Sequence, residues 1–233
     1  MQTVRKTLVI LTLFSIAMGY LESAVVIYLR EIYYPFGFSF PMVNMSRDIM
    51  ITELLREAAT LIMLFTVGWV AGRNGLERFL WFIYCFAIWD IFYYVFLKLL
   101  INWPASLLTW DILFLLPMVW TGPVITPVIV SLTMITFALF MLTNVIKPGA
   151  LRLKGLMVLG VFLIFLSFIW DFAGVMLDQY PVTKMFDPET SQHELSKYVP
   201  YGFNWWIFIG GELMVLTGIS VSHHNSKNIS HEN

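Results

Sequence analysis

The chain contains six apolar stretches that are each long enough to cross a lipid bilayer, and this feature limits its fold more than any other. A spanning helix needs about 20 apolar residues, and the six stretches with their connections take up nearly all of the 233 residues. The expected spans are residues 8–29, 49–71, 79–100, 122–146, 155–177 and 202–221. We therefore expect an all-α, polytopic transmembrane helix bundle in a single domain, residues 1–221, followed by a polar C-terminal tail, residues 222–233.

The composition supports this fold class. Apolar residues make up 59% of the chain and charged residues 12%, about half the charged fraction of roughly 25% that is usual for a soluble domain. This balance argues against a soluble enzyme, a disordered regulator and a nucleic-acid binder. The lipid bilayer is the one partner that the composition predicts directly.

The first apolar stretch has two interpretations. Arg5 and Lys6 precede it, and Ala17–Gly19 has the small-x-small pattern of a signal-peptide cleavage site. The apolar run continues to Leu29, well past this site. An uncleaved first span is therefore favoured, and cleavage remains the alternative.

The segment before the fourth span is rich in helix breakers. Pro104 and Pro117 interrupt it, Pro123 follows it, and its apolar run 110–120 is too short to cross a bilayer. We expect Pro104–Trp120 to form a short interfacial or re-entrant half-helix. A kinked entry to the fourth span is the alternative.

Lysine and arginine are unevenly distributed between the two sides of the expected bundle. With the N-terminus inside, the inner segments hold eight Lys and Arg residues against two acids, whereas the outer loops hold four against six. An excess of Lys and Arg marks the cytoplasmic side of membrane proteins. We therefore expect a multi-pass protein of the plasma (inner) membrane with both termini in the cytoplasm.

Charged residues inside the expected membrane segments are the main functional signal. There are nine of them: Glu22, Glu53, Arg56, Glu57, Asp90, Lys98, Asp111, Asp171 and Glu212. A charge at the bilayer centre costs at least about 2.5–3.5 kcal/mol, so such residues mark functional sites by default. All nine fall in the middle and outer zones of the membrane, whichever direction their helix runs.

Helical spacing groups several of these residues. Asp90, Tyr94 and Lys98 follow one another at intervals of four, and Glu53 and Glu57 share this spacing, which places each set on one helix face. We expect five acids to bind a substrate or ion around an outward-opening cavity: Glu22, Glu57, Asp90, Asp171 and Glu212. Three further side chains are expected to act as their charge partners: Arg56, Lys98 and Tyr94.

A purely structural interpretation competes for the shallower residues. Acids near a helix N-terminus, such as Glu53 and Asp111, are stabilised by the helix dipole. Arg56 and Lys98 can pair with acids to hold helices together, and Lys98 can also reach the interface. The deeper acids are harder to explain in this way.

The sequence predicts no cofactor and no metal site. None of the four histidines lies in a span, and the single cysteine, Cys85, cannot form a cysteine metal site. Carboxylates alone could hold Ca²⁺, Mg²⁺ or Mn²⁺, but their spacing here is not diagnostic. Phosphate-binding glycine loops and hydrolase signatures are also missing from the sequence.

These observations favour a small transporter, or a subunit of a transport complex, in which buried acids bind a proton, a cation or a cationic substrate. Two alternatives remain open. One is an intramembrane enzyme that acts at the outer leaflet with a carboxylate pair as acid and base. The other is a structural or assembly subunit whose charges pair internally. Membrane-complex subunits or further copies of the chain are possible partners in each case.

Overall fold

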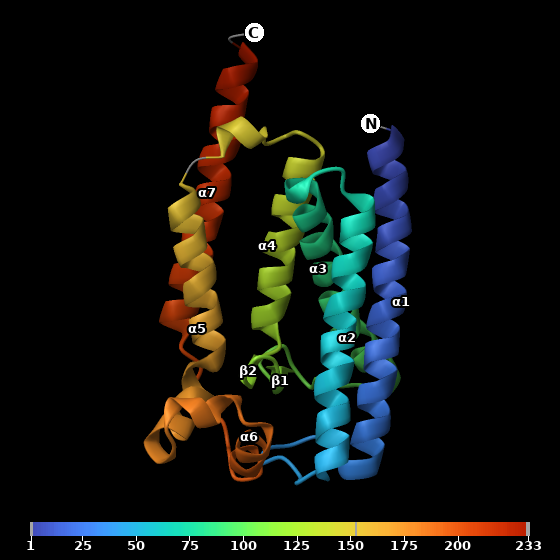
Figure 1. Cartoon of the computed structure of the whole chain (residues 1–233), viewed down its shortest axis with the longest axis vertical. Coiled ribbons are helices and arrows are strands. Elements are labelled where there is room, and N and C mark those ends of the chain that lie inside the picture. The colour runs from blue at the N-terminus through green and yellow to red at the C-terminus, as the bar shows by residue number, and fades with distance from the viewer. Residues whose placement is uncertain (1, 152, 232–233) are drawn as a thin grey trace.

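A computed structural model describes residues 2–151 and 153–231 and consists mainly of long helices (Figure 1). Its elements, in chain order, are α1 (Gln2–Tyr33), α2 (Arg47–Ala71), α3 (Gly75–Ile101), β1 (Trp110–Phe114), β2 (Trp120–Pro123), α4 (Ile125–Leu142), η1 (Pro148–Ala150), α5 (Lys154–Gln179), η2 (Val182–Phe186), α6 (Pro188–Leu195) and α7 (Trp205–His231). Six of the helices, α1 to α5 and α7, are long and apolar enough to cross a membrane. The expected all-α, six-span bundle is confirmed, and the chain is a multi-pass membrane protein.

The first and last helices extend past their expected ends. Helix α1 has 32 residues, or about 48 Å at 1.5 Å per residue, which exceeds the hydrocarbon thickness of about 30 Å. Helix α7 continues to His231, so residues 222–231 of the expected polar tail form part of that helix. Both termini lie at the same end of the bundle (Figure 1).

Helix α3 is the centre of the larger of two helix groups. It packs against α1, α2 and α4, and its buried side chains include Leu80, Cys85 and Leu97. The second group is the pair α5 and α7. This pair contacts the first group through β2 and through α4. The two groups can be followed as separate sets of ribbons in Figure 1.

Polar side chains define the ends of the helices that follow the first two loops. Ser46 caps α2 by accepting a hydrogen bond from the backbone N–H of Ile49, and Asn74 caps α3 by accepting one from the N–H of Glu77. Helix α3 ends where Asn102 adopts the left-handed conformation, with φ of 53°. Asparagine tolerates this conformation better than most residues, which explains its place at the helix end.

The half-helix expected over Pro104–Trp120 is wrong. The structure has no helix there, and β1 and β2 pair antiparallel to form a hairpin. Proline removes a helical hydrogen bond and restricts the residue before it to extended conformations. Because Pro104 precedes β1 and Pro117 lies in the turn, this segment adopts extended backbone more readily than helix.

Several backbone polar groups of the hairpin have partners within the protein, as irregular backbone in a membrane protein would need. Beyond the strand pairing, the N–H groups of Val124 and Ile125 donate to the carbonyls of Thr109 and Leu107 at 3.0 and 2.8 Å. The N–H of Leu115, just after β1, donates to a side chain of α2 described below. The hairpin is thereby held between the two helix groups.

Helices α5 and α7 approach each other closely where Gly160 faces Gly211. A Cβ atom added at Gly211 would lie 2.7 Å from the carbonyl oxygen of Gly160, whereas one added at Gly210 would meet no atom within 4 Å. Small residues at such a crossing allow helix backbones to pack directly in a membrane. This crossing joins the second helix group.

We predict that Gly211→Ala forces α5 and α7 apart and destabilises the protein by about 1–3 kcal/mol, as overpacking usually does. The matched control is Gly210→Ala, which has open space around it and should be neutral or slightly stabilising because alanine favours helix. Thermal unfolding of the purified proteins in detergent measures both. Equal melting temperatures for the two variants would contradict the close crossing.

Candidate functional site

A cavity of about 240 Å³ lies among α1, α2, α3, the hairpin and the η2–α6 segment. It occupies the half of the bundle opposite the termini. Most of its wall is apolar. Seven charged side chains of the described residues line it: Glu22, Arg30, Glu53, Arg56, Glu57, Asp90 and Asp111.

Arg56 joins two of these acids. Its Nε donates to Glu53 at 2.8 Å, one helical turn away on α2, and its Nη1 donates to Glu22 on α1. Thr60 Oγ1 donates to the second oxygen of Glu22 at 3.3 Å. The side chains of both acids are about nine-tenths buried, at 10–11% exposure. The guanidinium therefore compensates two carboxylates that would be costly to bury alone.

Glu57 lies one turn deeper on α2 than Glu53 and has a different partner. The backbone N–H of Leu115 lies 3.0 and 3.1 Å from its two carboxylate oxygens. Glu57 is buried, with 6% of its surface exposed. The hairpin thus positions this carboxylate through a backbone dipole without contributing a basic side chain.

Asp90 faces the cavity from the middle of α3. Its Oδ2 accepts a hydrogen bond of 2.8 Å from Ser131 Oγ on α4. Among the described residues, no Lys, Arg or His nitrogen lies within 4 Å of the carboxylate of Asp90 or Glu57. These two acids line the cavity without an ion-pair partner.

Arg30 forms the second charged pair, in the last turn of α1. Its Nη2 lies 3.4 Å from Asp111 Oδ1, and Tyr94 OH donates to the other oxygen of Asp111 at 3.4 Å. The guanidinium also lies 3.7 Å from the ring centroid of Trp103 and 4.7 Å from that of Phe38. Cation–π contacts of this kind stabilise a desolvated guanidinium. The Nη1 of Arg30 is buried and has no hydrogen-bond partner among the described residues, so the neighbours satisfy this guanidinium only in part.

The charges of the cavity do not balance. Five carboxylates and two guanidinium groups line it. The formal balance is therefore three negative charges when all five acids are ionised. Carboxylates so placed favour a bound cation or bound protons. The cavity is thus chemically suited to a positively charged ligand.

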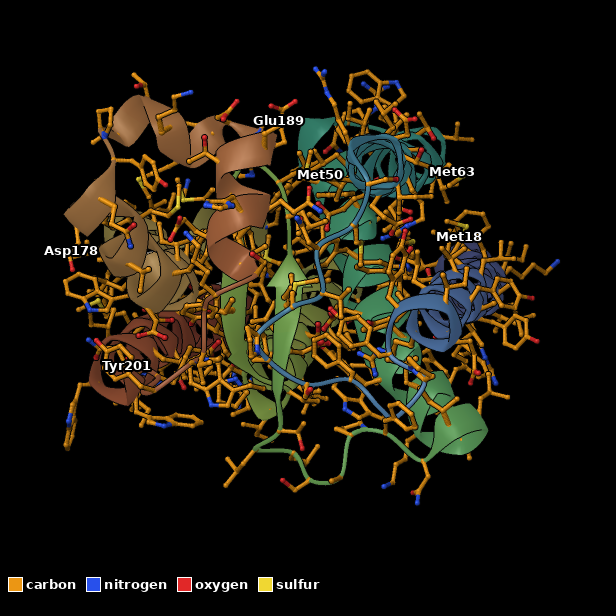
Figure 2. All side chains as sticks on the ribbon, turned by 90° about the horizontal axis from the view of Figure 1, so that it is seen from below. Met18, Met50, Met63, Asp178, Glu189 and Tyr201 are labelled. Carbon is orange, nitrogen blue, oxygen red and sulfur yellow. The ribbon has the colours of Figure 1, made fainter. Side chains whose placement is uncertain are left out.

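The η2–α6 segment covers the end of the cavity that lies farthest from the chain termini (Figure 1). Met185, Ser191 and Leu195 belong to this segment and line the cavity. The segment is held to the α1–α2 loop by a hydrogen bond from the N–H of Met42 to the carbonyl of Leu195 at 3.1 Å. An exposed ion pair between Arg47 and Glu189 adds a second contact at 2.8 Å. Glu189 can be found on α6 in Figure 2.

Glu194 stabilises this covering segment from within. Burial raises the pKa of its carboxyl, but hydrogen bonds from Lys197 Nζ and Tyr180 OH outweigh this effect, and the net pKa lies below the usual value. A depressed pKa means that the folded form gains stability from the ionised acid at neutral pH. The segment is therefore tied to the end of α5 by an ionised group.

The structure brings together five of the eight side chains that the sequence analysis selected. Three predicted binding acids line the cavity, and so do two predicted partners: Glu22, Glu57, Asp90, Arg56 and Tyr94. Arg56 forms an ion pair with Glu22. Tyr94 donates its hydrogen bond to Asp111, which is not one of the five predicted binding acids.

The other three predicted residues lie elsewhere. Asp171 accepts a hydrogen bond from Tyr198 on the α5 side of the fold, and Glu212 accepts one of 2.9 Å from Thr133 between α4 and α7. Lys98 donates to the carbonyl of Pro104 at 3.0 Å, at the end of α3. None of the three lines the cavity.

Sequence reasoning missed Arg30 and Asp111 as cavity residues, whereas it placed Glu53 on the same helix face as Glu57 without choosing it as a binding residue. Arg30 was expected in a loop, but α1 continues to Tyr33, which places Arg30 in the last turn, two turns beyond Glu22. The sequence signal that could have identified Arg30 was its position two helical turns after Glu22. For Asp111 there was no such signal, because only the hairpin brings it to Arg30.

The described residues contain no group of three or more His, Cys, Asp or Glu side chains arranged to hold a metal ion. The carboxylates of the cavity instead contact guanidinium, hydroxyl and backbone N–H groups. The arrangement can bind an organic cation or exchange protons.

Comparisons with protein-family models, with curated proteins and with solved structures found no match for this chain. The function must therefore be argued from the chemistry of the cavity itself.

We predict that Arg56→Gln destabilises the protein by about 3–5 kcal/mol, because it leaves two buried carboxylates without their counter-charge. Adding Glu22→Gln and Glu53→Gln to that variant should restore most of the lost stability. The control is Arg73→Gln: the Arg73 side chain is 83% exposed and pairs with Glu77 at the bundle surface, where such a pair contributes about 0–1 kcal/mol. Melting temperatures in detergent measure all three variants. Equal decreases in melting temperature for Arg56→Gln and Arg73→Gln would refute the role of Arg56 as the link between Glu22 and Glu53.

Proposed function

We propose that the protein binds a cation in the outward cavity and acts as a small transporter or as the binding subunit of a transport complex. The observation that carries this proposal is the excess of carboxylates over guanidinium groups in one cavity. Glu57 and Asp90 are the proposed binding groups, since neither has an ion-pair partner. Glu22, Glu53 and Arg56 form a charged wall beside them.

The construction of the cavity also favours transport. In many transporters the substrate site lies near the middle of the membrane, beside segments with irregular backbone. Here the hairpin interrupts the helical bundle and its turn lines the cavity. Glu57 and Asp90 lie near the middle of their helices, about 15 Å and 22 Å from the ends where α2 and α3 begin, at 1.5 Å per residue. Both features agree with a site that a solute reaches from the outside.

One set of contacts favours the alternative of a structural or assembly subunit. Glu22, Glu53 and Asp111 each pair with an arginine in the folded protein. If Glu57 and Asp90 also served only helix packing, the cavity would bind no cation. Cation binding therefore separates the two functions.

We further propose that both termini face the cytoplasm and that the cavity opens on the opposite side of the plasma (inner) membrane. The excess of Lys and Arg in the segments near the termini supports this orientation. The cavity would then receive its ligand from outside the cell. The excess of outer-loop acids would attract cations toward its mouth.

We predict that choline, a small organic cation, binds the purified protein in lipid nanodiscs, and that Glu57→Gln or Asp90→Asn weakens this binding at least about tenfold. A carboxylate about 5 Å from the quaternary ammonium attracts it by roughly 3 kcal/mol at an effective dielectric constant of about 20, and 1.4 kcal/mol corresponds to tenfold in affinity. Isothermal titration measures binding, and uptake of labelled choline into proteoliposomes measures transport.

Two exposed acids outside the cavity provide matched controls. Glu31→Gln and Asp178→Asn remove the same kinds of charge from exposed positions and should leave choline binding unchanged. The uncharged choline isostere 3,3-dimethyl-1-butanol should bind far more weakly. Equal binding of the alcohol, or normal binding by both cavity variants, would overturn the proposal. Binding without uptake would exclude a transporter that acts alone.

A further inference from the structure

The two ends of the cavity differ in chemistry. Glu22 and Arg30 line it from positions eight residues apart on α1, which corresponds to about 12 Å along the helix axis. The deep end carries Glu22, Glu57 and Asp90, whereas the outer end lies under the η2–α6 segment and the α1–α2 loop. The other end also holds Arg30, which is paired with Asp111, so a ligand that fills the cavity meets an excess of acids at one end and a neutral ion pair among apolar side chains at the other.

Methionine is unusually frequent in the apolar wall. Five methionines from four different segments line the cavity: Met42, Met45, Met50, Met118 and Met185. Methionine is unbranched and flexible, so a wall made of it adapts to ligands of different shape. Two of the five, Met50 and Met185, are buried, with 9% and 7% of their surface exposed.

Aromatic side chains complete the wall near the charged groups. Trp89 and Tyr93 flank Asp90 on α3, and Phe114 lies at the end of β1. Aromatic faces attract organic cations and exclude water from them. The volume of about 240 Å³ is also several times the roughly 30 Å³ that a water molecule occupies. The cavity thus offers much more space and apolar contact than a single inorganic ion can use.

From this arrangement we propose that the ligand is an organic cation with an apolar body, and that the cavity accepts a range of such cations. The inference rests on the proposed function and narrows its ligand class. The cationic group lies at Glu57 and Asp90, and the apolar body lies against the methionines beneath the η2–α6 segment. The excess of acids selects the charge, and the flexible wall tolerates differences in the body.

The test is the affinity of the wild-type protein in nanodiscs for tetramethyl-, tetraethyl- and tetrapropylammonium, with empty nanodiscs as the blank. Each step adds four methylene groups to the same charge. Because burial of one methylene contributes about 0.8 kcal/mol, burial of only two of the four predicts at least about tenfold tighter binding at each step. Flat or falling affinity along the series would overturn the inference.

A pair of methionines on α2 supplies a matched comparison. Met50 lines the cavity and lies on the side of α2 near α6, whereas Met63 lies away from it and is 42% exposed (Figure 2). Met50→Ala should weaken tetrapropylammonium binding at least about fivefold and change tetramethylammonium binding less than twofold. Met63→Ala should change neither. Retained tetramethylammonium binding shows that Met50→Ala is folded, and Met185→Ala provides a second variant of the same kind.

The outcomes separate this inference from the proposed function. If tetramethylammonium binds through Glu57 and Asp90 but larger cations bind no better, the apolar-body inference fails and the cation site stands. If the wild-type protein binds none of the three cations, both fail. If Met50→Ala and Met63→Ala weaken tetrapropylammonium equally, the methionine wall is not the binding surface and the inference fails.

Discussion

The ion pair between Arg56 and Glu22 is the interaction on which the cavity depends. Helices α1 and α2 pack mainly against α3 and touch each other little, so this pair is a principal link between them. Glu53 holds the guanidinium from the side. Charges at membrane depth persist only when they are paired or face a polar cavity. Here the same three side chains meet both conditions, because they join two helices and form the wall of the cavity.

The hairpin supplies the other contacts that hold the charged side chains of the cavity in place. Strands β1 and β2 form where the sequence predicts a half-helix, and they bring Asp111 to Arg30 and a backbone N–H to Glu57. Their turn also closes one side of the cavity. Because irregular backbone at this depth needs internal partners, the acids of the helices and the groups of the hairpin stabilise each other.

The sequence predicted the fold class well and the site only in part. Long apolar runs identify spans because a bilayer requires them, and spacing on one helix connected Glu53, Arg56 and Glu57. Contacts between helices have no such rule, so Asp171 and Glu212, chosen for their depth, lie against Tyr198 and Thr133 instead. The hairpin was missed because short apolar runs between prolines do not distinguish strand from helix.

The central claim is that the unpaired acids of the cavity hold a cation. An experimental structure determined with 2-bromoethyltrimethylammonium tests it most directly, because the anomalous signal of bromine locates the ligand without ambiguity. The account predicts a bromine peak inside the cavity, with the ammonium group within roughly 4–6 Å of the carboxylate of Glu57 or Asp90. An empty cavity, or a peak only on the lipid-facing surface, would contradict it.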